Sequence, residues 1–110
     1  MDKLSKTSLL IDFYGDLLTD KQKSAMILHH EQDMSFGEIS ENLNISRQAV
    51  YDTLKRSEKL LDNYESKLGL VEKFEAQKAK LNELKNIIIN SNMEDKSKAL
   101  KIINDLLEIY

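Results

Sequence analysis

The segment SFGEISENLNISRQAVYDTLKR, residues 35–56, decides how this chain folds. It predicts a short helix, a tight turn over residues 42–45, and a second helix that follows Ser46. Ser35 and Glu38 have the spacing of a capping box, and Ser46 is placed to cap the second helix. Two helices joined in this way form a helix-turn-helix unit, which we expect to be the centre of both fold and function.

Small and turn-forming residues stand where the two helices should meet. Ser40 is small enough for a close helix crossing. Asn44 occupies the position that needs a left-handed backbone, which asparagine tolerates better than other non-glycine residues. Ile45 is predicted to fill the core behind the turn. The stripe predicted to face the core from the first helix consists of Phe36, Ile39 and Leu43. The alternative is an ordinary packing unit of two amphipathic helices.

The second helix is expected to present polar, reaching side chains on its outer face. These are Arg47, Gln48, Tyr51, Asp52 and Lys55. Arg47 suits guanine, Gln48 suits adenine and Lys55 suits a phosphate. Residues 46–61 carry four Lys or Arg against two Asp or Glu. This local basic excess falls where DNA binding needs it.

The whole chain is acidic, with 16 Lys and Arg against 19 Asp and Glu and a net charge of −3. Proteins that hold nucleic acid unaided usually present a basic face, so binding here must depend on local charge. The chain has no proline and three glycines, which favours an all-α fold, and no cysteine, which excludes disulfides. It lacks a signal-peptide pattern and a membrane-spanning run. We therefore expect a soluble, cytoplasmic protein without membrane insertion.

Two further helices are predicted before the motif. Residues 4–18 have the apolar spacing of a core helix, which Gly15 should weaken but need not end. Thr19 and Gln22 then form a second capping box. Adjacent helical residues point about 100° apart, so His29 and His30 are expected to be packed or surface side chains and not metal ligands.

The C-terminal half predicts a dimerisation element. Gly69 either ends the long helix or only weakens it. After it, apolar residues follow a heptad spacing with Gln77 as its polar member. The predicted dimerisation residues are Leu70, Phe74, Leu81, Leu84 and Ile88. A last apolar helix opens near Asp95 or Ser97. We thus expect a helix-turn-helix domain over residues 1–66 and a dimerisation region over residues 67–110, the alternative being that the last helix packs on the first domain.

The sequence contains no constellation typical of catalysis. It has no glycine-rich phosphate loop and no nucleophile with a plausible base. We expect no enzymatic activity, no catalytic residue, no metal site and no cofactor.

Several stretches resemble known families. Leu18 and Thr19 with Gln22, the segment MSFGEISENLNISRQAVYDTLKR, and residues 64–68 and 73–75 are similar to region four of bacterial sigma factors and, more closely, to the YlxM family of helix-turn-helix proteins. The resemblance implies a dimeric, all-helical cytoplasmic protein with a regulatory role, linked by operon association to the signal recognition particle pathway. Ser40 and Asn44 depart from the alanine and glycine usual in the motif.

The resemblance also implies a recognition role for individual residues. With Arg56 from the same basic helix, the predicted DNA-binding set is Ser46, Arg47, Gln48, Tyr51, Lys55 and Arg56. The expected partners are duplex DNA, a second copy of the chain and signal recognition particle components. The expected function is DNA-binding regulation. The alternative is a protein or ribonucleoprotein adaptor that keeps the fold without sequence-specific DNA binding.

Overall fold

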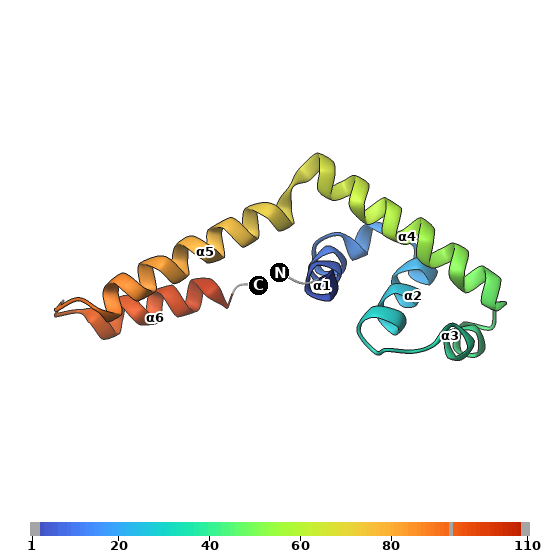
Figure 1. Cartoon of the computed structure of the whole chain (residues 1–110), viewed down its shortest axis with the longest axis horizontal. Coiled ribbons are helices and arrows are strands. Elements are labelled where there is room, and N and C mark those ends of the chain that lie inside the picture. Colours follow the sequence, from blue (N-terminus) through green and yellow to red (C-terminus); the bar gives the residue numbers. More distant parts are fainter. Residues whose placement is uncertain (1–2, 93, 109–110) are drawn as a thin grey trace. The chain divides into compact units, whose positions relative to one another are not determined.

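The computed structural model describes residues 3–92 and 94–108, and within these ranges every regular element is a helix (Figure 1). The elements in chain order are α1 (Lys3–Tyr14), the 3-10 turn η1 (Gly15–Leu17), α2 (Asp20–His30), α3 (Phe36–Leu43), α4 (Arg47–Leu68), α5 (Leu70–Ile89) and α6 (Lys96–Leu107). The predicted all-α fold class is therefore confirmed. No helix in the described ranges is both long and apolar enough to cross a membrane.

Contacts divide the chain into two units, residues 1–71 and residues 72–110, which we call the head and the hairpin. The boundary expected from the sequence lay between residues 66 and 67. The head extends further because Val71 is 2% exposed and belongs to its core.

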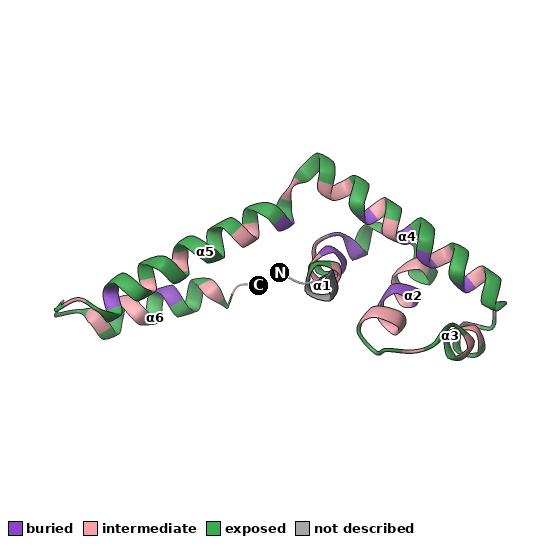
Figure 2. Ribbon diagram, in the orientation of Figure 1, coloured by how far each residue is buried: buried purple, intermediate pink, exposed green. Residues whose placement is uncertain are grey.

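The core of the head forms where α1, α2 and α3 pack against the long helix α4. Figure 2 shows buried residues on α1, α2 and α4. Removing these apolar side chains from water is the main source of the stability of the head. The buried cluster consists of Leu10, Ile11, Tyr14, Leu18, Ala25, Met26, Ile39, Val50, Leu54, Leu61 and Val71.

The capping boxes predicted for α2 and α3 are both present. The Thr19 hydroxyl accepts the Gln22 N–H at 3.2 Å, and the Gln22 side chain accepts the Thr19 N–H at 3.0 Å. Ser35 and Glu38 make the matching pair of bonds, each at 3.1 Å. Each box satisfies two backbone donors that helix geometry leaves without partners.

The first helix is shorter than predicted, because the α-helix ends at Tyr14 and Gly15 begins a 3-10 turn. Leu18 is then extended, with φ −84° and ψ 160°, and its N–H donates to the Gly15 carbonyl. This tighter turn directs Leu18 into the core and leaves Leu17 exposed. Lys23 pairs with Asp16 across the turn, which lowers the pKa of Asp16 and raises that of Lys23.

Gly69 ends α4. Its φ of +63° is left-handed, a conformation in which a Cβ would be strained, and its N–H donates to the Glu65 carbonyl at 2.8 Å. The next helix therefore begins at once, at Leu70, and its first N–H groups need partners.

Those partners come from the head. The Tyr14 hydroxyl donates to Glu65 Oε1 at 2.6 Å and accepts the Leu70 N–H at 3.1 Å. The same Glu65 oxygen accepts the Val71 N–H at 3.0 Å. Burial and the Glu65 carboxylate raise the pKa of Tyr14. The start of α5 is thus held to the head by a buried phenol and a carboxylate.

The hairpin consists of the rest of α5 and of α6, which returns along it in Figure 1. The turn between them is held by the Ser91 hydroxyl, which donates to the Ile88 carbonyl at 2.7 Å, and by Lys96 Nζ, which donates to the Ser91 carbonyl at 3.4 Å. Only Ile88 and Ile103 are buried among the described hairpin residues. Figure 2 shows most of α5 and α6 exposed.

Candidate nucleic-acid interface

The turn between α3 and α4 has the geometry that the sequence predicts. Asn44 is left-handed, with φ 55° and ψ 48°, and its N–H donates to the Ser40 carbonyl. The Ser40 hydroxyl donates to the Ile45 carbonyl at 2.6 Å, so this small residue also closes the turn. Ser46 caps α4, its hydroxyl accepting the Ala49 N–H at 3.0 Å. These local bonds define how α4 leaves α3.

The helix α4 has a buried side and an exposed side. Val50, Leu54, Ser57 and Leu61 are buried against the head. The predicted DNA-binding residues Ser46, Arg47, Gln48, Tyr51, Lys55 and Arg56 are all exposed. Successive residues turn by about 100°, so Arg56 lies on a different flank from Tyr51. The structure therefore places Ser46, Arg47, Gln48 and Tyr51 at the start of α4, Lys55 one turn beyond Tyr51, and Arg56 on another flank.

Arg47 lies against the first turn of α3. Its guanidinium is so close to Gly37 that a Cβ added there would be 3.0 Å from Nη2 and 3.2 Å from Cζ. Gly37 therefore leaves the space that this side chain occupies. This role could not be predicted from the sequence, because the two residues are ten positions apart and no local pattern connects them.

Gln48 is paired with an acidic neighbour on the outer face of α4. Its Nε2 donates to Asp52 Oδ1 at 3.1 Å. A bidentate contact of glutamine with adenine uses the side-chain oxygen and one of the two amide N–H groups, so the other N–H can keep its bond to Asp52. In the structure, Gln48 and Asp52 both present acceptor oxygens, which suit the amino groups of adenine and cytosine.

Aromatic rings form a row beside α4. The Tyr51 and Phe36 ring centroids are 6.2 Å apart, and those of Phe36 and His29 are 5.2 Å apart. The prediction that Phe36 faces the core is wrong, because its side chain is 36% exposed. Phe36 is the first residue of α3, and its ring lies between Tyr51 and His29 on the surface. Lys55 Nζ lies 5.6 Å from the Tyr51 centroid.

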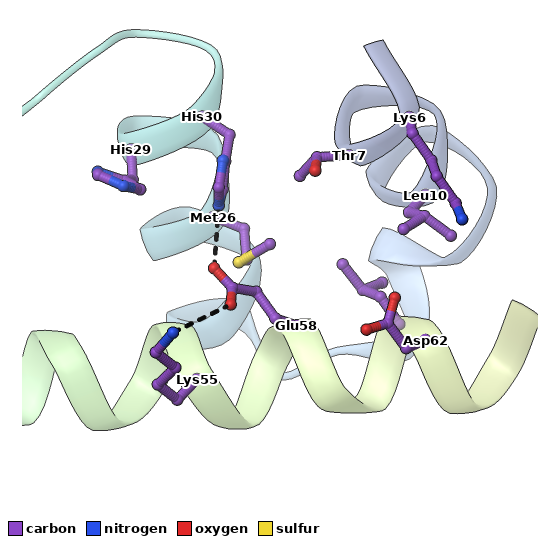
Figure 3. Close-up of a pocket in the computed structure, with 10 residues that line it drawn as sticks. Lys6, Thr7, Leu10, Met26, His29, His30, Lys55, Glu58 and Asp62 are labelled. Atoms are coloured by element: carbon purple, nitrogen blue, oxygen red, sulfur yellow. Dashed lines mark hydrogen bonds and ion pairs between the residues drawn. The ribbon is translucent and has the colours of Figure 1, made fainter. Parts of the chain in front are cut away.

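A cavity of about 450 Å³ adjoins this row, between α1, α2 and α4. Figure 3 shows His30, Glu58 and Lys55 on one wall and Thr7 and Leu10 facing them. His30 Nε2 is 3.3 Å from Glu58 Oε1, and Lys55 Nζ is 4.0 Å from Glu58 Oε2. Glu58 is 28 residues from His30, so no local sequence pattern connects them.

The two histidines have structural partners. His29 Nδ1 is 3.1 Å from the Met34 carbonyl, and the two imidazole centroids are 4.8 Å apart. Both side chains are half-buried, which agrees with packed or surface histidines. Among the described residues, no group of three or more His, Cys, Asp or Glu is arranged to hold a metal.

The charge of the motif is balanced. Residues 35–56 carry Arg47, Lys55 and Arg56 against Glu38, Glu41 and Asp52. Lys55 is also shared with Glu58, which weakens its attraction for phosphate. Because phosphate contacts supply most sequence-independent affinity, a single α4 is expected to bind duplex DNA weakly.

The capped α3, the left-handed turn and the exposed start of α4 define a helix-turn-helix protein. The chain belongs to the UPF0122 family, described as "Putative helix-turn-helix protein, YlxM / p13 like", which matches residues 1–103. The resemblance inferred from the sequence is thus confirmed.

Three relatives illustrate the similarity. A UPF0122 protein of Acetivibrio thermocellus is 46% identical over 112 residues, which cover 98% of this chain and 96% of the relative. UPF0122 protein YlxM of Bacillus subtilis is 46% identical over 100 residues, 91% of each chain. A UPF0122 protein of Geobacillus sp. is 42% identical over 109 residues, with 99% and 98% covered. The family likeness therefore extends over both the head and the hairpin.

Proposed function

We propose that this protein is a DNA-binding regulator that reads the major groove with the start of α4. Arg47, Gln48 and Tyr51 would contact base edges, while Ser46, Lys55 and Arg56 would lie near phosphates. The observation that carries the proposal is the exposed outer face of α4, presented by a capped turn of helix-turn-helix geometry.

The balanced charge argues that two copies act together. Dimeric helix-turn-helix proteins place two recognition helices on successive half-sites, which multiplies a weak single contact. The predicted interface on α5 supports such pairing, because Leu70 and Leu84 are exposed and Phe74 and Leu81 are half-buried. Ile88 is already buried within the hairpin, so its contribution is to hold α6.

A role in the signal recognition particle pathway is the finer part of the proposal. It rests on the resemblance to the YlxM family, which is linked to that pathway by operon association. The protein would then act in the cytoplasm, as a regulator of these genes or in contact with particle components. No enzymatic step is required for either role.

Selection from random duplex DNA at low salt tests the DNA-binding role. We expect an enriched sequence, and we expect Arg47→Ala to weaken binding to it about tenfold, since a base contact contributes about 1–3 kcal/mol. Lys59→Ala is the matched control, because Lys59 is exposed on α4 but lies three turns further along. No enriched sequence, or equal binding by Arg47→Ala, would exclude groove reading.

A second candidate is a protein or ribonucleoprotein adaptor without sequence-specific DNA binding. The exposed Phe36 and Tyr51 rings and the carboxylate of Asp52 on the same surface favour it. Capture from a lysate with and without nuclease separates the two candidates. Partners that survive nuclease and are lost on Phe36→Ser support the adaptor, whereas partners lost with nuclease support nucleic-acid binding.

A further inference from the structure

The hairpin has too little core to be stable by itself. Its described residues bury only Ile88 and Ile103, although residues 72–110 include two helices. Domains below about 40 residues usually need a disulfide, a metal or a partner chain. The chain has no cysteine for a disulfide and its described residues form no metal-ligand cluster, so further burial has to come from another protein surface.

The hairpin also exposes apolar side chains along one side. Ile87 is 61% exposed, Ile102 is 54% exposed, and each precedes a buried isoleucine by one residue. Each therefore lies about 100° around its helix from the helix–helix contact. The two helices run antiparallel and face each other. A turn of about 100° in the same sense along each chain therefore brings both side chains to the same side of the hairpin. Leu84 and Leu106 are also exposed. Around their helices, they lie between the exposed isoleucine and the side that contacts the other helix.

This side contains a groove on α5 with a volume of about 460 Å³. Its described lining consists of Lys73, Ala76, Gln77, Lys80, Leu81 and Leu84. The floor is apolar and the rim carries two lysines. A fitting partner is a helix with an exposed apolar stripe and a carboxylate on its flank.

The helix α6 has this chemistry. Ile102 and Leu106 are one turn apart and exposed, and Asp105, three residues after Ile102 on the flank of this stripe, is exposed as well. Lys80 precedes Asn90 by ten residues and Asp105 follows Asp95 by ten residues. The lysine and the carboxylate are thus about 15 Å along their helices from the turn of the hairpin.

We propose that the α5 groove of one copy binds α6 of a second copy. Ile102 and Leu106 of the second copy cover Leu81 and Leu84, and its Asp105 lies beside Lys80. With the two hairpin turns at the same end, the contact is reciprocal, so it closes as a two-fold dimer in the form of a four-helix bundle. This interface rests on the proposed dimer, and it adds α6 to the α5 residues predicted from the sequence.

Sedimentation equilibrium of the full chain at tens of micromolar tests the interface. We expect a dimer mass for the natural chain and a monomer mass for the double variant Ile102→Glu with Leu106→Glu, in which the head still unfolds cooperatively. A natural chain of monomer mass, or a double variant that remains dimeric, would overturn the proposal.

A charge exchange tests the pairing itself. Lys80→Glu or Asp105→Lys alone should raise the dimer dissociation constant about tenfold, because each places like charges together. The two together should restore it to within about threefold, since the pair is only reversed. Lys78→Glu is the control, because Lys78 lies on another flank of α5 over the Phe74 ring. Additive losses in the double variant would contradict the pairing.

These masses are measured without DNA, so the dimer interface and the DNA-reading role of α4 can be refuted independently of each other. A dimer that selects no duplex sequence removes the reading role of α4 and leaves the interface. A monomer that still enriches a sequence removes the interface and leaves the reading role.

Discussion

The head and the hairpin bury very different amounts of apolar surface. Eleven of the thirteen buried apolar residues in the described part of the chain belong to the head, and the other two are Ile88 and Ile103. Yet α5 and α6 are regular helices of 20 and 12 residues. The comparison teaches that helical structure and a stable core are separate properties: the head has both, whereas the hairpin has helices that depend on a further contact.

The two regions also differ in how their polar groups are satisfied. The head contains two capping boxes and the hydrogen bond from the buried Tyr14 to Glu65. Asp95, at the N-cap of α6, makes no side-chain capping bond. A region with few caps and little burial opens more easily, which suits an element that assembles with a partner.

Separate fragments should show the largest effect. Residues 1–71 alone should be helical and unfold in one cooperative transition, because their core is complete. Residues 72–110 alone should be largely unfolded at low micromolar concentration and gain helix as the concentration rises, because burial then comes from self-association. Circular dichroism over a concentration series measures both. A hairpin fragment that is helical and monomeric, or a head fragment without a cooperative transition, would reverse the comparison.

Matched isoleucine truncations should sharpen the contrast within the full chain. Ile39→Ala, at a fully buried position in α3, should lower the free energy of unfolding by about 2–5 kcal/mol, since it leaves a cavity. Ile87→Ala removes the same atoms from an exposed position on α5 and should change it by less than about 0.5 kcal/mol. Urea denaturation, at concentrations below those that favour a dimer, gives both values. Equal losses in the free energy of unfolding would show that Ile87, like Ile39, is buried in solution.

Tyr14→Phe tests the bonds that attach the start of α5 to the head, with a smaller expected effect. Removing the hydroxyl should cost about 1–3 kcal/mol, because the Leu70 N–H loses its acceptor and Glu65 loses a donor. Thermal or urea unfolding measures the loss. Tyr51→Phe is the control, since that ring is exposed on α4.

The stability that Tyr14 contributes should depend on pH. Burial raises the pKa of Tyr14 in the folded protein, so its neutral form is favoured there. The resulting stability is complete below about pH 10, where the unfolded phenol is also neutral, and is lost as the pH rises through the raised pKa. The difference between natural chain and Tyr14→Phe should therefore shrink as the pH rises above about 10. A difference that stays constant over this range would contradict the cause assigned to the shift.

Much of the head was predictable because its signals are local. A capping residue and its partner are three positions apart, so Thr19 with Gln22 and Ser35 with Glu38 were visible in the sequence. The need for a left-handed residue identified Asn44 in the same way. Periodicity also identified the buried side of α4, although it misplaced Phe36, because a helix-start residue with helical spacing can lie at the edge of the core.

The site was less predictable, because its geometry depends on residues far apart in the chain. Gly37 makes room for Arg47, Glu58 binds both His30 and Lys55, and Asp52 engages Gln48. The contacts of Gly37 with Arg47 and of His30 with Glu58 follow from how α2, α3 and α4 pack, whereas Lys55 and Glu58 are three residues apart on α4. The Asp52 contact is local, and the four-residue spacing of an amide and a carboxylate on one helix face was the signal that could have found it.

The sequence by itself determined that this chain is all helical, that residues 35–56 form a helix-turn-helix unit and that Gly69 is a candidate helix end. These properties depend on side-chain spacing and backbone preference within a few residues. Only the tertiary structure decided that α1 ends at Tyr14, that Tyr14 and Glu65 hold the start of α5, and that the hairpin leaves its apolar side exposed. Those outcomes depend on which helices pack together, and burial between distant segments is not encoded in any single stretch.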